Sequence, residues 1–287
     1  MKNYSENKKV LITGANSYIG MSFENWAKEH YGESITVDTL DMLDENWREK
    51  DFSPYDAVYH VAGIAHADVG HVSEETKELY YKVNRDLAVE TAEKAKKEGI
   101  KQFIFMSSLI IYGESEKYGR DKTITKDTEP EPANFYGDSK WQADKKLREL
   151  QEDGFNIAII RPPMIYGEGC KGNYAALKKM AMKLPVFPKV KNERSMLNID
   201  RLCEFLCNLI LSGEAGIFFP QDPEYGCTSE IVKRIAAENN HKIFVSKIFA
   251  PFVFLASKCP GKIGGLTNKA FGNMKYDMEL SKHDFGE

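Results

Sequence analysis

The sequence lacks the features that mark secreted or membrane-spanning proteins. Its five cysteines are an odd number at scattered spacings, which excludes the disulfide framework of a small secreted domain. No apolar run approaches the roughly 20 residues that a membrane span needs. The polar N-terminal residues lead into an apolar run of strand length, too short for the core of a signal peptide. These absences predict a cytoplasmic protein.

The sequence also lacks a strong excess of charge of one sign. Its formal net charge is only −4, which gives no electrostatic case for binding nucleic acid or an anionic membrane. The most apolar stretch, IFAPFVFLA at residues 248–256, is predicted to be a buried helix, with contact at a membrane edge as the alternative. Cys203 and Cys207 are four positions apart on a predicted helix. Buried thiols are favoured there over a metal pair, because no partner ligands lie nearby.

Short apolar segments alternate with helical periodicity over the first part of the chain. Because the predicted strands are apolar almost throughout, they favour an α/β fold whose parallel sheet is covered on both faces. The rhythm breaks after Pro162, which predicts a sheet domain at residues 1–161 and a smaller lobe at 162–287, parts of which return to the sheet. Strands are predicted at residues 9–13, 34–38, 55–63, 100–108 and 155–163, and helices at 17–32, 79–99 and 135–154.

The segment VLITGANSYIG at residues 10–20 ends the first strand and opens the first helix. Backbone N–H groups and the helix dipole can hold a pyrophosphate at such a turn, as in the doubly wound sheets of the Rossmann type. Gly14 and Gly20 frame the turn. Ser17 stands where the pattern T-G-x-x-G-x-x-G has its middle glycine, and its small hydroxyl can donate a hydrogen bond to a phosphate oxygen.

An acidic residue follows the second strand of the predicted sheet. Asp38 lies 24 positions after Gly14, where a carboxylate suits a ribose 2′-hydroxyl and repels a 2′-phosphate. This favours NAD over NADP as the cofactor. Asp41 competes for the same role, and a strand end without a ligand is the plain alternative for Asp38.

Tyr136 and Lys140 are four positions apart and share one face of a predicted helix. An ammonium beside a phenol favours the phenolate, so the spacing predicts a tyrosine whose pKa is lowered toward neutrality and that can exchange a proton with a sugar hydroxyl. The spacing alone is weak, because the pairs Tyr4 and Lys8, Tyr118 and Lys122, and Tyr174 and Lys178 repeat it. Only Tyr136 and Lys140 open a helix between the strand that ends in Ser107 and Ser108 and the next strand.

These motifs, in this order, resemble the extended short-chain dehydrogenases and reductases of the NAD-dependent epimerase/dehydratase family. Within that family the sequence is most similar to bacterial enzymes that modify nucleotide sugars for surface polysaccharides. The resemblance covers about residues 8–225 and fades toward the C-terminus. The segments that carry it are TGANSYIG at 13–20, HVAG at 60–63, KVNRDLA at 82–88, SSLIIYG at 107–113, YGDSK at 136–140 and RPPMIYGEG at 161–169.

The resemblance implies a role for each matching residue. Tyr136 would be the catalytic acid/base, Lys140 would tune it and hold the nicotinamide ribose, and Ser108 would hydrogen-bond the reacting sugar oxygen. Asn173 and Arg194 would contact the diphosphate of a nucleotide sugar, a contact that suits a forked guanidinium. The residues implied to bind NAD are Gly14, Ser17, Tyr18, Ile19, Gly20, Asp38, Ala62, Gly63, Asn84, Ser107, Tyr136, Lys140 and Pro163.

The resemblance leaves three functions open. The first is an NAD-dependent 4-epimerase of a UDP-hexose or UDP-N-acetylhexosamine, the second is an NAD(P)H-dependent reductase of a UDP-4-keto-6-deoxy-sugar, and the third is a non-catalytic nucleotide sensor. Met164 stands where glucose-type 4-epimerases usually carry an asparagine, which favours N-acetylhexosamines. The implied partner is a nucleotide sugar. Neither nucleic acid nor a membrane span is expected, and a homodimer is left open.

Three histidines gather in HVAGIAHADVGH at residues 60–71. A metal site formed by His60, His66 and His71 is disfavoured, because the pattern places no carboxylate partner and the resembling family needs no metal. The prediction is therefore no metal, with His66 facing the sugar instead.

Overall fold

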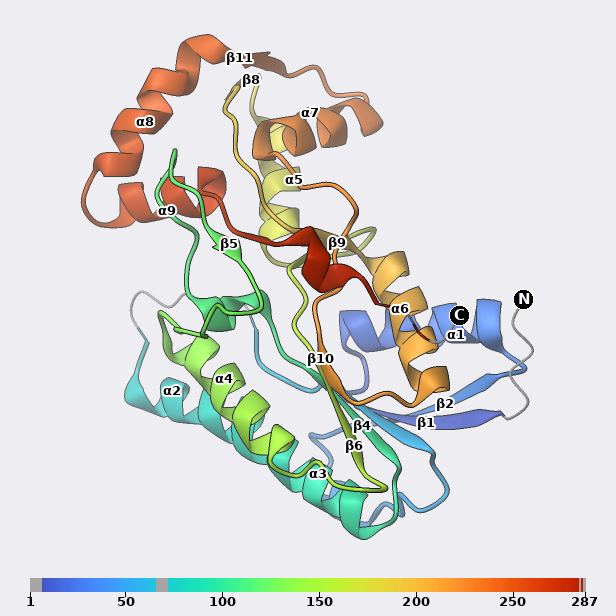
Figure 1. The fold of residues 1–287 in the computed structure, drawn as a ribbon. Coiled ribbons are helices and arrows are strands. Elements are labelled where there is room, and N and C mark those ends of the chain that lie inside the picture. The colour runs from blue at the N-terminus through green and yellow to red at the C-terminus, as the bar shows by residue number, and fades with distance from the viewer. Residues whose placement is uncertain (1–6, 66–71, 284, 286–287) are drawn as a thin grey trace.

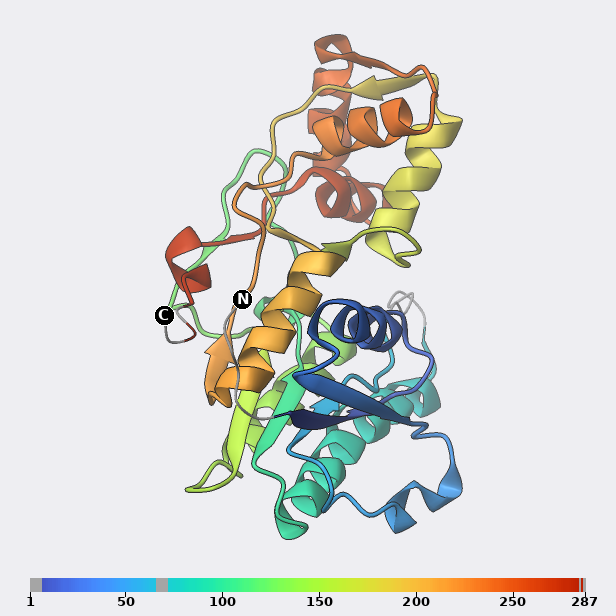
Figure 2. The ribbon, with the colours of Figure 1, turned by 90° about the vertical axis from the view of Figure 1, so that its right-hand side faces the viewer.

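The computed structural model describes residues 7–65, 72–283 and 285. Figure 1 shows these residues arranged as a sheet half, with the main parallel sheet and helices α1 to α4 and α6, and a lobe that carries α5, α7 to α9 and the short strands β8 and β11. The view in Figure 2, turned by 90°, shows the same two halves stacked end to end. Among the described residues, no helix is long and apolar enough to cross a bilayer.

The sheet half contains six strands that all pair in parallel within the described chain. Strand order reverses between β1 and β3, and ligands of doubly wound sheets bind at such a switch point. The last strand comes from beyond Pro162, so a segment of the C-terminal part does return to the sheet. In spatial order the strands are β10 (Gly216–Phe218), β6 (Asn156–Ile160), β4 (Gln102–Met106), β3 (Ala57–His60), β1 (Lys8–Thr13) and β2 (Ile35–Leu40).

Helices cover both faces of this sheet, which confirms the predicted α/β fold of Rossmann type. One face packs against α1 (Tyr18–Tyr31) and α6 (Ile199–Ser212), and the other against α3 (Leu87–Lys97) and α4 (Phe135–Arg148). Cys203 and Cys207 are buried in α6 against the first face, as predicted, and all five cysteines are unpaired.

The helix predicted at residues 79–99 differs from expectation. The structure has α2 (Glu74–Tyr81), a π-helical turn η2 (Lys82–Asp86) and then α3. The π turn adds a residue to one helical turn and buries the side chain of Asn84. Hydrophobic periodicity does not reveal such a turn, and π turns occur frequently at functional sites.

The lobe has its own small core, which includes Leu177, Phe187, Ile231 and Ile235. Its elements are α5 (Asn173–Lys183), β8 (Val186–Pro188), α7 (Thr228–Glu238), β11 (Phe244–Ser246), α8 (Ala250–Lys258) and α9 (Lys262–Phe271). Two further strand pairs lie between the halves, β5 (Thr123–Ile124) with β12 (Lys275–Tyr276) and β7 (Met164–Tyr166) with β9 (Met196–Asn198). The single turns are η1 (Glu45–Glu49), which packs in the sheet half, η3 (Leu109–Tyr112), η4 (Lys247–Phe249), which leads into α8 of the lobe, and η5 (Met278–Ser281).

The two halves are joined by a residue near the C-terminus. Tyr276 is fully buried, and its hydroxyl donates to the backbone carbonyl of Arg161 at 2.9 Å. Tyr276 also belongs to β12, which pairs with β5. Residues near the C-terminus therefore hold together segments from the middle of the chain, namely the end of β6 and β5.

The first interpretation of residues 248–256, a buried helix, is wrong. The segment does form a helical turn and most of α8, but only Val253 among its large apolar side chains is buried. Phe252, Phe254 and Leu255 are exposed. An apolar run shows that a segment favours leaving water, but it does not show which part of the chain covers it.

Candidate functional site

The loop between β1 and α1 approaches the end of β3 closely. Gly14 has φ +112°, and a Cβ at this position would lie 2.7 Å from the backbone nitrogen of Ala62. Gly14 therefore has no room for a side chain, and its positive φ is one that residues with a Cβ rarely adopt. This contact brings two predicted cofactor residues together at the switch point of the sheet.

Ser17 is the N-cap of α1. Its hydroxyl oxygen accepts a hydrogen bond from the Gly20 backbone N–H at 3.1 Å. A Cβ on Gly20 would lie 2.6 Å from that oxygen, so the serine and the last glycine of the motif fit each other. The serine hydrogen is left to donate toward a ligand at the helix N-terminus.

The structure separates the two candidate acids at the ribose position. Asp38 lies inside β2 opposite Leu11, where its carboxylate accepts a hydrogen bond from Tyr55 at 2.8 Å and pairs with Lys9 at 3.3 Å. The Tyr55 hydrogen bond, followed by Lys9, lowers the pKa of Asp38.

Asp41 instead follows the last residue of β2, Leu40, whose carbonyl accepts hydrogen bonds from the backbone N–H groups of Gly14 and Ala15. Its side chain is exposed and accepts a hydrogen bond from the Leu43 backbone at 2.9 Å. The structure therefore places Asp41 beside the glycine loop and leaves Asp38 engaged inside the strand, three positions before Asp41.

Tyr136 and Ser108 meet at the carboxyl end of β4. Tyr136 is in the first turn of α4, whose N-cap is Asn134, and the Ser108 side chain lies near enough to the phenol to lower its pKa. The ring of Tyr80 approaches Tyr136 edge-on at 6.0 Å between centroids. A phenol and a hydroxyl thus lie close together in a site walled by an aromatic ring.

The predicted lowering of the Tyr136 pKa by Lys140 is wrong for this structure. Burial raises the pKa of Tyr136 to about 12, against the lowering effect of the Ser108 side chain. The Lys140 ammonium is directed at the backbone carbonyl of Met106, to which it donates at 2.8 Å. A shared helix face brings the two side chains to one region, but it does not aim one at the other.

Lys140 is itself a buried cation in an apolar setting. Its ammonium lies 4.7 Å from the ring centre of Phe105, and burial lowers its pKa to about 8. A Cβ on Gly63 would lie 3.1 Å from the Lys140 nitrogen and 3.0 Å from the Asn84 side chain. Gly63, Asn84 and Lys140 therefore form one wall. A side chain at position 63 would crowd both the Lys140 ammonium and the Asn84 amide.

Asn84 supports this wall from the π turn. Its amide oxygen accepts from the Ile64 backbone N–H at 2.8 Å, and its amide nitrogen donates to the Ile64 carbonyl and to Ser139. The loop after β3 is thereby fixed to α4. Asn84, one of the residues implied to bind NAD, therefore acts in this structure as a support for the loop after β3.

A buried ion pair below the site was not found from the sequence. Arg161 and Asp144 form two hydrogen bonds of 2.9 Å each, and Arg161 also donates to Tyr112 at 2.7 Å. The hydroxyl of Ser107, predicted to touch the cofactor, donates to Asp144 at 3.2 Å instead. Helical spacing gave a signal, because Asp144 lies four positions after Lys140 on the same face of α4.

A second contact missed from the sequence joins β1 to β3. Thr13 and the Nδ1 atom of His60 are 2.7 Å apart, and both residues are buried. Burial, together with the positive charge of Lys140, lowers the pKa of His60 to about 3. Among the residues that the structure describes, no cluster of metal-ligating side chains occurs. His66 and His71 lie outside the described residues.

The residues predicted to contact a diphosphate lie on the lobe side. Asn173 is exposed and begins α5 behind Gly172, which has φ +78°. Arg194 is buried, donates to the Lys269 and Gly272 carbonyls, and leaves its Nε without a hydrogen-bond partner. Burial lowers the pKa of Arg194 to about 10. The guanidinium has no carboxylate partner among the described residues, as expected of a group that receives an anion.

Tyr18, Ile19 and Pro163 complete the predicted cofactor set. The Tyr18 hydroxyl donates to the Glu168 carbonyl at 2.9 Å, which ties the start of α1 to the segment after β7. Ile19 packs on the core of the sheet face, and Pro163 is buried. These contacts and this burial are structural, and none of the three residues carries a charged side chain.

The site as a whole fits a dinucleotide. The α1 N-terminus offers N–H groups for a pyrophosphate, Asp41 lies at the adjacent strand end, and Gly14 and Gly63 stand where a Cβ would clash with the walls. Ser108, Tyr136 and Lys140 lie at the carboxyl ends of the next strands. This is the arrangement that a hydride-transfer site requires.

Three comparisons with known proteins agree with this arrangement. The family model described as NAD-dependent epimerase/dehydratase family matches residues 10–203. The chain is 29% identical to UDP-glucose 4-epimerase of Vibrio cholerae over 97% of its length and 90% of that protein. It is 28% identical to N-acetyl-α-D-glucosaminyl-diphospho-ditrans,octacis-undecaprenol 4-epimerase of Escherichia coli O157:H7, over 92% and 82% of the two chains.

A solved structure extends the likeness in fold. The dTDP-4-dehydrorhamnose reductase of Bacillus anthracis, in complex with NADP, superimposes with a TM-score of 0.68 at 19% identity, over 83% of each chain.

Proposed function

The chain belongs to the NAD-dependent epimerase/dehydratase family, and from this premise we propose that it is a 4-epimerase of a nucleotide sugar, a UDP-hexose or a UDP-N-acetylhexosamine. The observation that supports this most directly is the Ser108–Tyr136 pair beside Lys140. As a member of this family the protein is an NAD-dependent enzyme. The substrate and the direction of the reaction are the parts proposed here.

The chain's own groups act on the C4 hydroxyl of the sugar. Tyr136 accepts the hydroxyl proton during oxidation and returns it during reduction, while Ser108 holds the C4 oxygen. Bound NAD supplies the hydride acceptor and, when oxidised, a positively charged ring. Because burial keeps the Tyr136 phenol protonated, the phenolate forms only when positive charge is added to the site.

The cofactor-binding residues favour NAD(H) that stays bound. We assign the adenosine ribose to Asp41, since it follows the end of β2 beside Gly14, and not to Asp38. A carboxylate there disfavours a 2′-phosphate. We expect Asp41→Asn to weaken NAD binding about tenfold or more, as loss of a charge-assisted hydrogen bond would. Asp38→Asn should change it by less than about threefold, and the reverse order in equilibrium titration would return the role to Asp38.

The other readings remain distinct from this proposal. A UDP-4-keto-6-deoxy-sugar reductase would use the same Ser108, Tyr136 and Lys140 but release its cofactor in each cycle. A non-catalytic sensor would have no need of a buried phenol beside Ser108, or of the cost of burying Lys140. The cytoplasmic location and a homodimer stay predictions.

A second candidate keeps the reaction and changes the carrier of the sugar. The Escherichia coli relative is named for a sugar on undecaprenyl diphosphate, and such a substrate carries the same diphosphate group as a nucleotide sugar. The exposed apolar side chains of α8 favour this candidate, because a soluble nucleotide sugar gives them no role. Arg194 would contact the diphosphate in either case.

One experiment separates the candidates. Purified protein is denatured to release bound nucleotide and is assayed, without added cofactor, on UDP-glucose, UDP-galactose, their N-acetyl forms and N-acetylglucosaminyl-diphospho-undecaprenol in detergent. We expect released NAD(H) and interconversion of a gluco/galacto pair, with the N-acetyl pair preferred. Cofactor-free protein that is inert on all these sugars and reduces a UDP-4-keto-6-deoxy-sugar with NADH or NADPH would establish the reductase instead.

A further inference from the structure

The outer side of the lobe exposes an unusual amount of apolar surface. Ile248 is 74% exposed, Phe252 66% and Leu255 62%, although all three are large apolar side chains. Figure 1 shows α8 and β11 at the end of the lobe farthest from the sheet. We call this surface the lobe face; its exposed apolar residues are Leu184, Val186, Phe244, Ile248, Phe252, Phe254, Leu255, Ile263 and Leu266.

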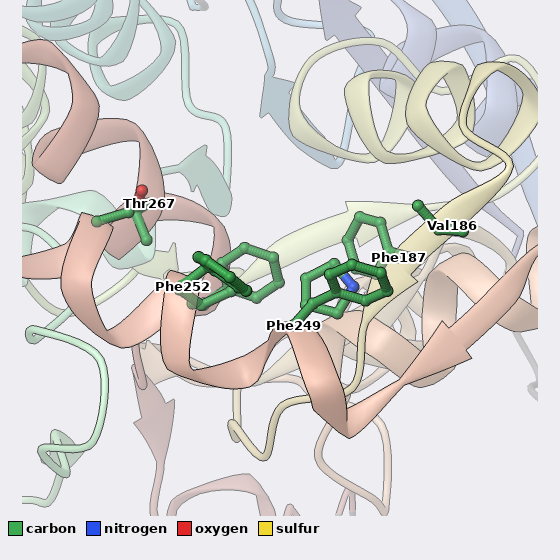
Figure 3. A pocket seen from close by; sticks show the side chains of 9 residues that line it. Val186, Phe187, Phe249, Phe252 and Thr267 are labelled. Atoms are coloured by element: carbon green, nitrogen blue, oxygen red, sulfur yellow. The ribbon is translucent and has the colours of Figure 1, made fainter.

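The lobe face contains a pocket lined by apolar side chains. The pocket has a volume of about 280 Å³ and lies between β8 and the helices α8 and α9. Figure 3 shows Phe187, Phe249 and Phe252 around it, with Thr267 on the opposite side. Groups that enter this pocket from outside would have to be apolar, since every lining residue except Thr267 is apolar.

The chain segment that forms most of the lobe face carries lysines and no acidic residue. Between residues 239 and 274 the sequence has five lysines and no aspartate or glutamate, and Lys183 and Lys189 flank β8 in the same way. These lysines are exposed, and none of them forms an ion pair in the part of the chain that the structure describes. The five are Lys242, Lys247, Lys258, Lys262 and Lys269.

The lysines and apolar side chains share helix faces. In α9, Lys262, Leu266 and Lys269 are spaced by four and three residues and so point to one side. In α8 the ammonium of Lys258 lies 4.1 Å from the ring centre of Phe254. A basic rim around an apolar centre is the pattern of helices that lie in the interface of a membrane.

We propose that the lobe face docks the protein on the surface of an anionic phospholipid bilayer. Apolar side chains of α8 and α9 enter the boundary between headgroups and acyl chains, and the lysines lie among the anionic headgroups. The net charge of −4 does not argue against this, because the acidic residues lie elsewhere in the chain. No membrane span is involved, in agreement with the helix lengths of the described residues.

Charge favours a bilayer over a second copy of the chain. A twofold interface would place this surface against itself, so the unpaired lysines of both copies would face each other across a low-dielectric contact. An anionic bilayer supplies the opposite charge along the whole rim. The same exposed side chains of α8 support the lipid-linked candidate substrate, but the test of bilayer docking contains no substrate, so it can fail without deciding between the sugar carriers.

The test is flotation of the full-length protein with vesicles. Wild-type protein should bind vesicles of phosphatidylglycerol and phosphatidylethanolamine, and should bind phosphatidylcholine vesicles at least about tenfold less. Phe252→Ser with Leu255→Ser should weaken binding to the anionic vesicles about tenfold or more. Lys258→Glu with Lys262→Glu should do so by about 25-fold, at roughly fivefold for each lysine near the surface.

Matched variants on the sheet half serve as controls. Leu43→Ser with Leu79→Ser changes exposed leucines, and Lys97→Glu with Lys101→Glu reverses exposed lysines; both should bind the vesicles as wild type does. Thermal unfolding checks that every variant is folded. Three outcomes would overturn the proposal: no binding of wild type to anionic vesicles at low salt, equal loss in lobe and control variants, or a dimer without vesicle binding that the Phe252 and Leu255 changes dissociate.

Discussion

The two halves of the molecule depart from ordinary burial in opposite ways. The sheet half buries charged side chains, with Lys140, Asp144 and Arg161 all nearly inaccessible to solvent. The lobe does the reverse, since Phe252 and Leu255 are more exposed than buried. Both departures cost free energy unless something offsets them. They therefore fit different functions: the chemical step in the sheet half, and the proposed docking on a bilayer in the lobe.

The difference also shows how a net property conceals a local one. Averaged over the chain, charge and hydropathy are those of an ordinary soluble protein. The average hides a lobe face with apolar side chains and unpaired lysines, so the net charge by itself says nothing about what that face binds. Paired substitutions, one in each half, test whether the two halves respond differently, as their different burial predicts.

The largest effect is expected from the buried ion pair. Asp144→Ala removes the partner of Arg161 and should lower the free energy of unfolding by about 3–5 kcal/mol, as measured by denaturant titration. Phe252→Ser, in the lobe, should change it by less than about 0.5 kcal/mol because that side chain is exposed. Equal losses in the two variants would remove the distinction between the halves. Asp144→Asn, which keeps a hydrogen-bond acceptor, should fall between them.

Next in size is the effect on the reaction itself. Tyr136→Phe should slow the chemical step about 100-fold or more, the usual contribution of a positioned proton donor, while NAD still binds. Tyr174→Phe is the lobe control, because Tyr174 and Lys178 have the same spacing on α5. Tyr118→Phe is a second control, and both should keep the chemical step. Single-turnover rates measure this, and near-normal activity of Tyr136→Phe would exclude the assignment.

A smaller effect concerns the pH dependence of stability. Lys140 has a pKa of about 8 in the folded protein against 10.5 for an ordinary lysine. Between these values the unfolded chain binds more protons, so the free energy of unfolding rises with pH, by up to about 1.4 kcal/mol per pH unit. This contribution should disappear in Lys140→Met, giving a difference of about 2 kcal/mol between roughly pH 8 and 10.

Lys178→Met, at an exposed position of the lobe, is the control for this pH profile. It should follow wild type across the whole range when unfolding is measured in denaturant at several pH values. A wild-type profile that runs parallel to that of Lys140→Met would mean that Lys140 is not a desolvated cation.

The smallest effect distinguishes the two helix starts. α1 is capped by the side chain of Ser17, whereas α5 begins behind Gly172 with no side-chain cap. Ser17→Gly removes the side-chain cap of α1, as at α5, and should lower the free energy of unfolding by a few tenths of a kcal/mol. The NAD affinity of this variant should stay within about tenfold of wild type. Ser17→Val, which adds bulk and removes the hydroxyl, should weaken NAD binding further. Unchanged affinity in the valine variant would place Ser17 away from the phosphates.

The sheet half could be predicted because its residues obey local rules. Apolar strands alternate with helices, and chain order selects Tyr136 and Lys140 from four equivalent pairs. Gly32 does end α1, but α4 ends at Arg148, before the glycine expected to end it. The end of β2 was misplaced by two residues because β-propensity sets strand boundaries poorly. The early strand end favours Asp38 in the sequence, whereas the observed strand end supports the proposal for Asp41.

The remaining features depend on contacts between distant segments. Lys140 binds the Met106 carbonyl instead of acting on Tyr136, and Asn84 is set by a π turn that no sequence period shows. The exposure of α8 is of the same kind, because the run at 248–256 is apolar whether or not another element covers it. Such features depend on which distant segments meet in the folded chain, and the local sequence does not encode those contacts.

The late position of Tyr276 has a consequence for synthesis on the ribosome. Its hydroxyl contacts the carbonyl of Arg161, a residue made 115 positions earlier. At about 5–20 residues per second, roughly 6 to 23 seconds separate the two. During that interval the nascent chain already carries Ser108, Tyr136 and Lys140, but the segment that locks the two halves together has not been made. A translational pause in this window would lengthen the time during which the two halves are not yet joined by Tyr276. Chaperones that bind emerging chains would then have longer to bind this incomplete chain.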